Sequence, residues 1–388
     1  MKIVYIASSI IPSRTANSIH VMKMCQAFAK NGHEVTLVIP GGRSGIETDV
    51  TDNYEFYGVD PCFEIERIPW FGVKGRTYVF GFSAARQALS LGPDLVYGRH
   101  APGCYFAAAH GIPVCYELHA PPADKGRMYE WFFKRLVQHR RFITAVFITQ
   151  ALASHCLRSF PALRNMHIVA PDGADQISDD TEVIDSGLPD RFAVGYAGSL
   201  YRGKGAEIVS QLAPRCPWAD FHIVGGSEQE LLEWREHYKN RENLFFHGFV
   251  NPKDVQKYLL GFDVLLLPNQ HRVMAHGAPV GGTNERDIGQ WTSPLKLFEY
   301  MASGKPIVCS NVPVLLEVAK DEANAIVCDP EDIDSWVNAI IRLRDNPELG
   351  QRVGANAKEE FLSCYTWSER ARRIVLSAEK GLRNWKRP

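Results

Sequence analysis

Short apolar runs alternate with amphipathic stretches along the whole chain. The apolar runs are rich in β-branched and aromatic residues and are bounded by turn formers, which is typical of buried strands. Helical patterns lie between most of them, such as Ile19–Lys30, which ends at Asn31 and Gly32, a usual C-terminal pair. This alternation predicts βα units around parallel sheets. The predicted strands are Lys2–Ala7, Glu34–Ile39, Cys62–Ile68, Asp94–Tyr97, Pro113–Leu118, Phe142–Ile148, Met166–Ala170, Phe192–Ala197, Phe221–Val224, Leu244–Phe246, Asp263–Leu267, Pro306–Cys309 and Ala325–Cys328.

The alternation is interrupted between residues 171 and 190. This segment holds two prolines and seven acidic residues and has little apolar periodicity, which indicates a surface linker. We therefore predict two Rossmann-like, doubly wound α/β domains, over residues 1–175 and 190–365, that face each other across a cleft. Ligands bind beyond the carboxyl ends of the strands in such sheets, so the residues that follow each strand are the candidates for the site.

Composition narrows the class of protein. The chain has 388 residues, 45% of them hydrophobic and 22% charged, with a formal net charge of −1, so nothing in the total predicts nucleic-acid binding. Neither a membrane-spanning run nor a signal peptide is evident, and we expect a cytoplasmic protein. The nine cysteines are scattered without a Cys-x-x-Cys pair, which favours buried, reduced thiols over a metal or redox site.

A candidate anion site lies at the start of a predicted helix over residues 293–303. Ser293 suits the N-cap, Pro294 the first helical position and Gly304 the stop. The helix follows strand Asp263–Leu267, so the amides at its N-terminus, around Leu295 and Lys296, would face the ligand edge of the sheet and accept a diphosphate. Ser293, Lys296, Glu299 and Ser303 form one polar stripe. We expect this stripe to face the ligand, with Glu299 holding a ribose.

A second candidate anion site is the loop that follows strand Phe192–Ala197. The loop, residues 198–205, has three glycines that would let the backbone approach a phosphate, and it adds the cations Arg202 and Lys204. Two anion sites on one sheet edge would bind a nucleoside diphosphate without a metal. They would also stabilise the charge that develops on a leaving diphosphate.

Asp332 and Asp334 are interpreted as a helix cap, not a metal motif.

As an ordered set, these features resemble family-four retaining glycosyltransferases of the group 1 type. The resemblance rests on Lys204-Gly205, Gly225-Gly226, residues 247–250, residues 263–268, the 293–304 helix, residues 32–35, 116–119, 171–175 and 365–367. It covers essentially the whole chain. It implies the two-domain GT-B fold, a nucleotide-sugar donor, retention of anomeric configuration, no metal or other cofactor, and a C-terminal helix over about 367–388 that packs on the N-terminal, acceptor-side domain.

The resemblance also implies roles for single residues. Glu299 binds the donor ribose, Lys204 and Arg202 contact the diphosphate, and His119 lies near the donor sugar as a catalytic residue. Further residues of the donor site are Gly225, Val250 against the nucleobase, and Ser293, Pro294, Leu295 and Lys296 at the helix start.

This chain departs from the family pattern at three places. Trp291 stands where the family has the first of two glutamates, and Glu285 and Asp287 are candidate substitutes. The paired glycines of the first loop are replaced by Ala16-Asn17-Ser18, where the amides of Asn17 and Ser18 and the Asn17 side chain are expected to hold a phosphate. Ser199 replaces an arginine, and Arg202 is its candidate replacement.

His119 directly follows strand Pro113–Leu118, at the predicted ligand edge, as Arg99 and His100 follow theirs. We expect an active-site role for His119. Glu117 is expected to face the opposite side of the strand and to be structural.

Residues 125–141 interleave basic with aromatic and apolar residues. This pattern fits two interpretations equally well. One is a helix that lies peripherally on the anionic inner membrane face, and the other is a domain-surface helix that buries its aromatic residues.

The expected function is metal-independent, retaining transfer of a sugar, from a UDP-sugar by family resemblance, to a glycan or lipid-linked acceptor. A catalytically inactive nucleotide-sugar binding protein and a nucleotide-sugar epimerase are the alternatives. A nicotinamide dehydrogenase is disfavoured because the loop after Ala7 lacks glycine.

Overall fold

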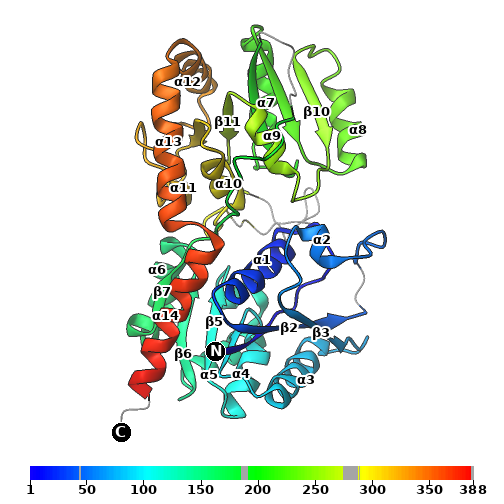
Figure 1. The fold of residues 1–388 in the computed structure, drawn as a ribbon, viewed down its shortest axis with the longest axis vertical. Coiled ribbons are helices and arrows are strands. Elements are labelled where there is room, and N and C mark those ends of the chain that lie inside the picture. The colour runs from blue at the N-terminus through cyan, green and yellow to red at the C-terminus, as the bar shows by residue number, and fades with distance from the viewer. Residues whose placement is uncertain (43–44, 185–190, 274–286, 288, 386–388) are drawn as a thin grey trace. The chain divides into compact units, whose positions relative to one another are not determined.

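The computed structural model describes residues 1–42, 45–184, 191–273, 287 and 289–385. The chain divides into two compact units, Met1–Asp172 with Trp367–Pro388, and Gly173–Thr366. Each unit is built on one all-parallel sheet (Figure 1). The predicted α/β class with two Rossmann-like sheets is therefore confirmed.

The first unit contains a seven-stranded sheet in the order β3-β2-β1-β4-β5-β6-β7. The order reverses between β1 and β4, which is the switch point where doubly wound sheets bind ligands. Helix α1 packs beside α14, and α3 packs beside α4, which packs beside α5. The strands are β1 Lys2–Ile6, β2 Glu34–Gly41, β3 Glu64–Pro69, β4 Leu95–Gly98, β5 Val114–Leu118, β6 Phe142–Phe147 and β7 His167–Val169. The helices are α1 Ala16–Lys30, α2 Asn53–Tyr57, α3 Arg76–Leu91, α4 Ala101–Ala109, η1 Pro122–Lys125, α5 Arg127–Val137, α6 Gln150–Ser159, η2 Pro161–Asn165 and α14 Trp367–Trp385.

Helix α1 begins three residues before the predicted start. Thr15 caps it, with a side chain that accepts a hydrogen bond from the Ser18 amide. The apolar periodicity begins only at Ile19, so the cap chemistry extends the helix beyond the apolar pattern. Its end at Lys30, followed by Asn31 at the C-cap, is as predicted.

Helix α14 returns to the first unit and packs against α1 and β6 (Figure 1). Its buried face consists of Trp367, Arg370, Ala371, Ile374, Val375 and Ala378. At its start the Ser368 carbonyl accepts a hydrogen bond of 2.8 Å from the side chain of Asn31. This face carries one charged residue, Arg370, which is 1% exposed.

The second unit contains a six-stranded sheet in the order β10-β9-β8-β11-β12-β13. Its switch point lies between β8 and β11. The strands are β8 Phe192–Ala197, β9 Ala219–Val224, β10 Leu244–Gly248, β11 Val264–Leu267, β12 Ile307–Ser310 and β13 Ile326–Cys328. The helices are α7 Ala206–Leu212, η3 Ala213–Arg215, α8 Glu228–His237, α9 Val255–Gly261, α10 Leu295–Ser303, α11 Pro313–Leu316, α12 Ile333–Asp345 and α13 Pro347–Cys364.

Several expectations about local chemistry can be compared with the structure. All nine cysteines are free, and only Cys62 and Cys364 are exposed. Asp332 caps α12 by accepting a hydrogen bond from the Asp334 amide, as predicted. Asp172, at the start of the predicted linker, is instead buried in the first unit. Among the described residues, no helix has the length and apolar character needed to cross a membrane.

Candidate active site

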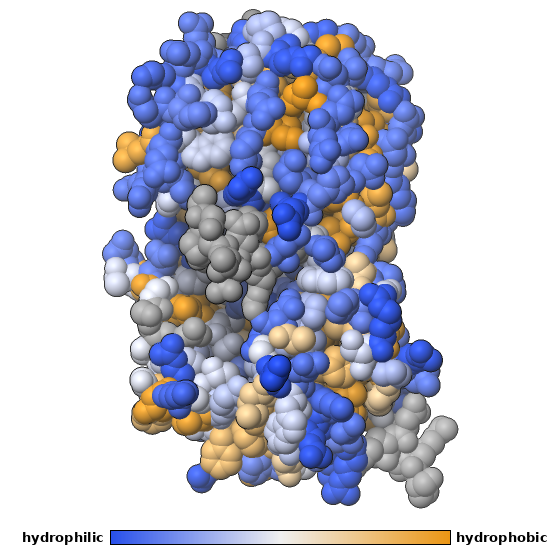
Figure 2. Space-filling model, turned by 180° about the vertical axis from the view of Figure 1, so that it is seen from behind, coloured by the Kyte–Doolittle hydropathy of each residue, from blue (hydrophilic) through white to orange (hydrophobic). Residues whose placement is uncertain are grey.

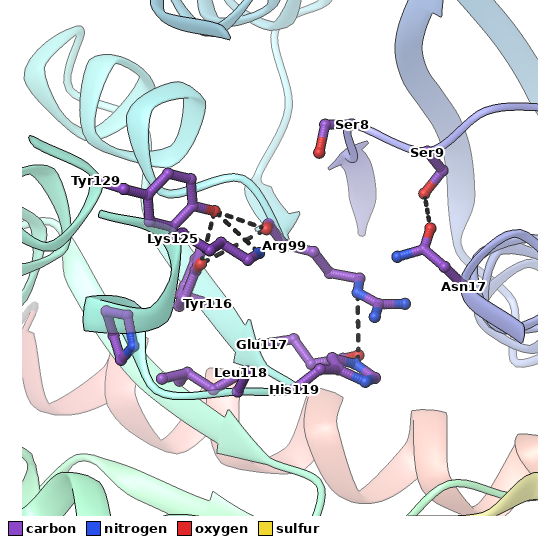
Figure 3. A pocket seen from close by; sticks show the side chains of 12 residues that line it. Ser8, Ser9, Asn17, Arg99, Tyr116, Glu117, Leu118, His119, Lys125 and Tyr129 are labelled. Carbon is purple, nitrogen blue, oxygen red and sulfur yellow. Dashed lines mark hydrogen bonds and ion pairs between the residues drawn. The ribbon is translucent and has the colours of Figure 1, made fainter. Parts of the chain in front are cut away.

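A pocket opens in the first unit beside the carboxyl ends of β1, β4 and β5. Figure 3 shows Glu117 and His119 near Arg99, with Ser9 and Asn17 on the opposite side. The sheet order brings these residues together because β1, β4 and β5 are neighbours around the switch point. The expected placement of His119 and Arg99 at the ligand edge is therefore correct. His100, in contrast, is buried and caps α4.

The expectation that Glu117 faces away from His119 is wrong. The two residues are two positions apart, so their side chains lie on the same side of an extended chain. Nε2 of His119 forms a hydrogen bond with Oε1 of Glu117. In the neutral imidazole this contact places the proton on Nε2, because a carboxylate can only accept. In the described part of the chain, Nδ1 of His119 has no hydrogen-bond partner.

Glu117 is surrounded by cationic and donating groups. Its Oε1 lies 2.8 Å from Nε2 of His20, and its Oε2 lies 3.2 Å from Nη1 of Arg370. The Tyr97 hydroxyl donates a hydrogen bond to Oε2. Burial by itself raises the pKa of Glu117, but His20, Arg370 and His119 outweigh it and hold the pKa well below its usual value. The carboxylate is therefore ionised although it is 1% exposed.

A second buried carboxylate lies on the other side of His20. Oδ1 of Asp172 lies 3.0 Å from Nδ1 of His20 and 4.0 Å from Nη2 of Arg370. Burial raises the pKa of Asp172, but its interactions with His20 and Arg370 lower it further than burial raises it. The two carboxylates, with His20 and the Arg370 guanidinium between them, thus form one buried charge cluster.

His119 itself is neutral at ordinary pH. Burial and the nearby Arg99 guanidinium lower its pKa to about 3, and the opposing effect of Glu117 does not compensate for them. With a proton on Nε2, the lone pair of Nδ1 is available to accept a hydrogen bond. His119 can therefore orient a hydroxyl group without itself taking up a proton.

Side-chain atoms of His20, Glu117 and His119 lie within 4.8 Å of one another, a spacing that a metal ion could bridge. The charge balance argues against a divalent cation. Glu117 already has the Arg370 guanidinium at 3.2 Å and the Arg99 guanidinium at 3.8 Å. A dication here would be repelled by both arginines while sharing the same carboxylate.

In the second unit, two lysines lie beside the carboxyl end of β8. Burial lowers the pKa of Lys204 to about 8. The pKa of Lys296 lies well below its usual value because of burial and repulsion by Lys204, which the attraction of Glu299 only partly offsets. Nζ of Lys296 lies 2.9 Å from the Tyr196 hydroxyl. Two neighbouring lysines with lowered pKa values, one of which repels the other, make a site that a bound anion would stabilise.

Two glycines of the loop at 198–205, Gly203 and Gly205, lie against the backbone that follows β11. A Cβ at Gly203 would lie 2.0 Å from the Arg272 carbonyl oxygen, and one at Gly205 would lie 2.1 Å from that of Pro268. Both glycines have positive φ, 85° and 99°. They therefore let the loop pack against the backbone after β11. The loop leads into α7 at Ala206, as predicted.

The start of α10 differs from the prediction by one residue. Pro294 occupies the N-cap with extended backbone angles, so Leu295 is the first helical residue and Ser293 is not the cap. Ser303 is buried, and its hydroxyl donates to the Tyr300 carbonyl. The ligand-facing stripe is thus reduced to Lys296 and Glu299, which are partly exposed. Gly304 ends the helix with a left-handed conformation, as predicted.

The remaining predicted residues of the donor site have varied surroundings. Arg202 is exposed, whereas Gly225, Val250 and Ser199 are partly exposed. The Ser199 carbonyl accepts a hydrogen bond of 2.8 Å from the Tyr196 hydroxyl. Trp291 is partly exposed as well.

Three further candidates can be placed by their contacts. Asn17 is exposed and accepts a hydrogen bond from Ser9, whereas the Ser18 hydroxyl is buried and donates to the carbonyls of residues 13 and 15. The Asp287 carboxylate accepts hydrogen bonds from the amides of Val273 and Gly289, so this oxygen is already engaged by the backbone. The alternative substitute, Glu285, lies outside the described residues.

Sequence reasoning missed His20, Asp172 and Arg370. His20 and Arg370 lie on the buried faces of α1 and α14, where a charged or polar side chain breaks the apolar pattern. A polar or charged residue on an apolar helix face could have been used to predict a buried partner, because polar and charged side chains are rarely buried without one. The partner itself could not be read from the sequence, since Arg370 and Glu117 are 253 positions apart.

Two family models match successive parts of the chain. Glycosyltransferase Family 4 matches residues 18–173, and Glycosyl transferases group 1 matches residues 180–360. An uncharacterized glycosyltransferase of Methanocaldococcus jannaschii is 27% identical over 191 residues, which is 48% of this chain and 44% of that protein. An alpha-D-kanosaminyltransferase of Streptomyces kanamyceticus is 24% identical over 271 residues, 64% of this chain and 65% of that one. The chain thus matches less than two thirds of the length of either relative.

Solved structures match over nearly the full length. HepE of Anabaena, in complex with UDP, has a TM-score of 0.72 at 14% identity, covering 98% of this chain and 100% of that one. Sucrose-phosphate synthase of Thermosynechococcus elongatus has a TM-score of 0.72 at 15% identity, covering 99% and 100%. At these identities the structural likeness concerns the fold. The two family models together span most of the chain and support a group 1 glycosyltransferase, and the solved structures show that the chain has the GT-B fold.

Proposed function

We propose that the protein is a retaining glycosyltransferase that moves a sugar from a UDP-sugar to a glycan or lipid-linked acceptor without a metal ion. The observation that carries the proposal is the pair Lys204 and Lys296, each with a lowered pKa, beside Glu299 near the start of α10. A nucleoside diphosphate supplies the anion that such a pair lacks and the ribose hydroxyls that a carboxylate can bind. HepE, which shares the fold, has been solved with UDP and with UDP-glucose.

In this proposal each group has a defined task. Lys204, the exposed Arg202 and the helix N-terminus at Leu295 stabilise the negative charge that grows on the diphosphate as the glycosidic bond breaks. Glu299 binds the ribose before and during that step. His119 accepts a hydrogen bond from a hydroxyl of the donor sugar through Nδ1. The cations take the place of a divalent ion, which is why we propose metal independence.

The test combines binding with turnover. A thermal-shift series with UDP, GDP, ADP and CMP should show the largest rise in Tm with UDP, because only a ligand that binds the native state stabilises it. Transfer from a UDP-sugar should persist in excess EDTA, and NMR of the product should show the anomeric configuration of the donor. Loss of transfer in EDTA with recovery in manganese, or an inverted product, would contradict the proposal. Binding without turnover would indicate an inactive binding protein, and epimerised donor would indicate an epimerase.

We also propose that α5 makes peripheral contact with an anionic membrane on which the acceptor is lipid-linked. Its inner face buries Phe132, Phe133 and Leu136, so the expectation of a domain-surface helix is met for those residues. On the outside, however, Met128 is 55% exposed and Trp131 44% exposed. The Arg135 guanidinium lies 5.4 Å from the centre of the Trp131 ring. Exposed apolar side chains with cations beside them are the features of an interfacial helix.

A further inference from the structure

The buried charge cluster of the first unit joins segments that are far apart in the sequence. Glu117 and His119 belong to β5 and its end, His20 to α1, and Arg370 to α14. Asp172 comes from the segment that follows β7, and Arg99 comes from the end of β4. The proposed function assigns a task only to His119. The other members therefore need an explanation of their own.

Both oxygens of the Glu117 carboxylate are held. Oε1 faces His20 and His119, and Oε2 faces Tyr97 and Arg370. A carboxylate fixed on both oxygens cannot rotate without losing several contacts in a region shielded from water, where each contact is strong. It therefore presents Oε1 to Nε2 of His119 in one orientation.

We propose that Glu117 is a positioning residue that fixes His119 in the Nε2–H tautomer, and that Arg370 of α14 holds Glu117 in place. The consequence is that Nδ1 of His119 is presented as an acceptor. This inference rests on the proposed function for its effect on the reaction, but the tautomer of His119 is a property of the free protein. Carboxylates that fix the tautomer of a histidine in this way are an established device in active sites.

A purely structural ion pair is the competing explanation, and other contacts of Arg370 make the two separable. The Arg370 side chain also donates to the carbonyls of Pro171, at 2.9 Å, and Ala170, at 3.2 Å. If Arg370 had only a structural role, its contacts with the two carbonyls and its positive charge near Glu117 would be sufficient. A positioning role requires in addition that changes at Arg370 reach the imidazole of His119.

The free protein provides the first test. Nitrogen-15 NMR of the His119 ring should show the proton on Nε2 in the wild type at neutral pH. In Glu117→Gln the amide can donate to Nε2, so the ring should shift toward the Nδ1–H tautomer. A wild type with the proton on Nδ1, or a Glu117→Gln variant with an unchanged tautomer, would refute the proposal without reference to any substrate.

Kinetics provide the second test, with a matched control on the same helix. Arg373 also lies on α14 and donates to a backbone carbonyl, that of Val169 at 3.1 Å, but it does not contact Glu117. Arg370→Lys should lower kcat roughly tenfold with donor KM within about twofold, and Glu117→Gln should lower kcat by about a hundredfold or more. Arg373→Lys should leave kcat and the His119 spectrum unchanged.

Equal losses of kcat in Arg370→Lys and Arg373→Lys would show that α14 acts only through its packing, and would overturn the proposal. If Glu117→Gln does not fold, the wild-type spectrum and the Arg370→Lys comparison still decide it. If the wild type transfers no sugar from any nucleotide donor, the proposed function fails, whereas the tautomer measurement still decides whether Glu117 positions His119.

Discussion

Single residues determine the chemistry of both units through the balance between burial and charge. Burial works against ionisation at Lys204, Lys296, Glu117 and His119 alike. At Glu117 the surrounding cations reverse its effect, and the carboxylate stays ionised. At the two lysines the attraction of Glu299 for Lys296 offsets only part of the cost of burial, so both pKa values stay lowered. Glu117 is therefore a carboxylate that protein groups already neutralise, whereas the charges of Lys204 and Lys296 are not fully neutralised by the protein.

Replacing Lys204 by alanine should therefore affect the transition state more than the bound donor. Charge on the diphosphate increases as the bond breaks, so losing a fixed cation should cost roughly 3 kcal/mol, or about a hundredfold in kcat. Glu299→Gln is the comparison variant: its ribose contact is made equally in both states, so it should mainly raise KM. Steady-state kinetics separate the two patterns. A folded Lys204→Ala variant with wild-type kcat would remove Lys204 from the diphosphate site.

The lowered pKa of Lys204 gives a pH dependence of known sign. Lys204 binds an anion in its protonated form, so kcat/KM for the donor should fall as pH rises through about 8, the pKa of Lys204, and not near the ordinary value of 10.5. Lys204→Arg keeps the positive charge at high pH, so its profile should stay flatter above pH 8 even if its maximum is lower. Identical profiles for the wild type and Lys204→Arg would rule out this assignment.

At the scale of elements, the strands were predictable and the helix starts were less so. Strands such as β8 matched because both faces are buried and the apolar run has the length of the strand. The starts of α1 and α10 were misplaced because Thr15 and Pro294 define them through backbone angles and a cap, beyond the apolar pattern. The residues of the candidate site were likewise predictable only where the local sequence pattern positions them. Residues at strand ends, such as His119, could be placed from sequence, whereas Arg370 depends on a contact 253 positions away.

Helix α5 carries a prediction at this scale. Figure 2 shows a face of the molecule on which hydrophilic residues predominate and apolar residues form several patches. Helix α5 exposes Met128 and Trp131 and carries the basic residues Lys134 and Arg135 in its last turn. Charge reversal of Lys134 and Arg135, both exposed, should reduce flotation with anionic liposomes at low salt and leave neutral liposomes unaffected. Lys239→Glu, an exposed change on the second unit, is the control. No flotation of the wild type, or equal loss in the control, would exclude membrane contact through α5.

At the scale of the whole molecule, each unit contains a histidine whose pKa in the folded protein lies well below the ordinary value. In the first unit this is His119, with a pKa lowered to about 3 by burial and Arg99. In the second unit it is His222, with a pKa lowered to about 4 by burial and by His247, whose Nε2 lies 3.0 Å from Nδ1 of His222. His222 is fully buried in a stack of rings that includes Phe245 and Phe262. Both units therefore exclude a proton that the unfolded chain would bind.

This pairing predicts how stability depends on pH. An unfolded histidine has a pKa near 6.5. As pH falls below that value, the unfolded chain takes up protons that folded His119 and His222 do not, so the free energy of unfolding decreases toward pH 4. Between pH 7.0 and 5.5 each histidine should contribute a loss of about 1 kcal/mol. Glu117 and Asp172, whose pKa values are lowered, contribute stability that is lost only at more acidic pH, below the pKa of an unfolded carboxyl.

Denaturant unfolding at pH 7.0 and 5.5 measures this loss, and His222→Phe isolates the share of the second unit. Phenylalanine keeps an aromatic ring in the stack but takes up no proton when unfolded, so the variant should lose about 1 kcal/mol less than the wild type between the two pH values, whatever its absolute stability. His237→Gln, at an exposed position of the same unit, is the matched control and should leave most of the pH-dependent loss in place. A His222→Phe variant with the same pH dependence as the wild type would mean that His222 is protonated in the folded protein. Its contact with His247 would then have to be an imidazolium–imidazole hydrogen bond, and burial would not control the charge of the second unit's interior.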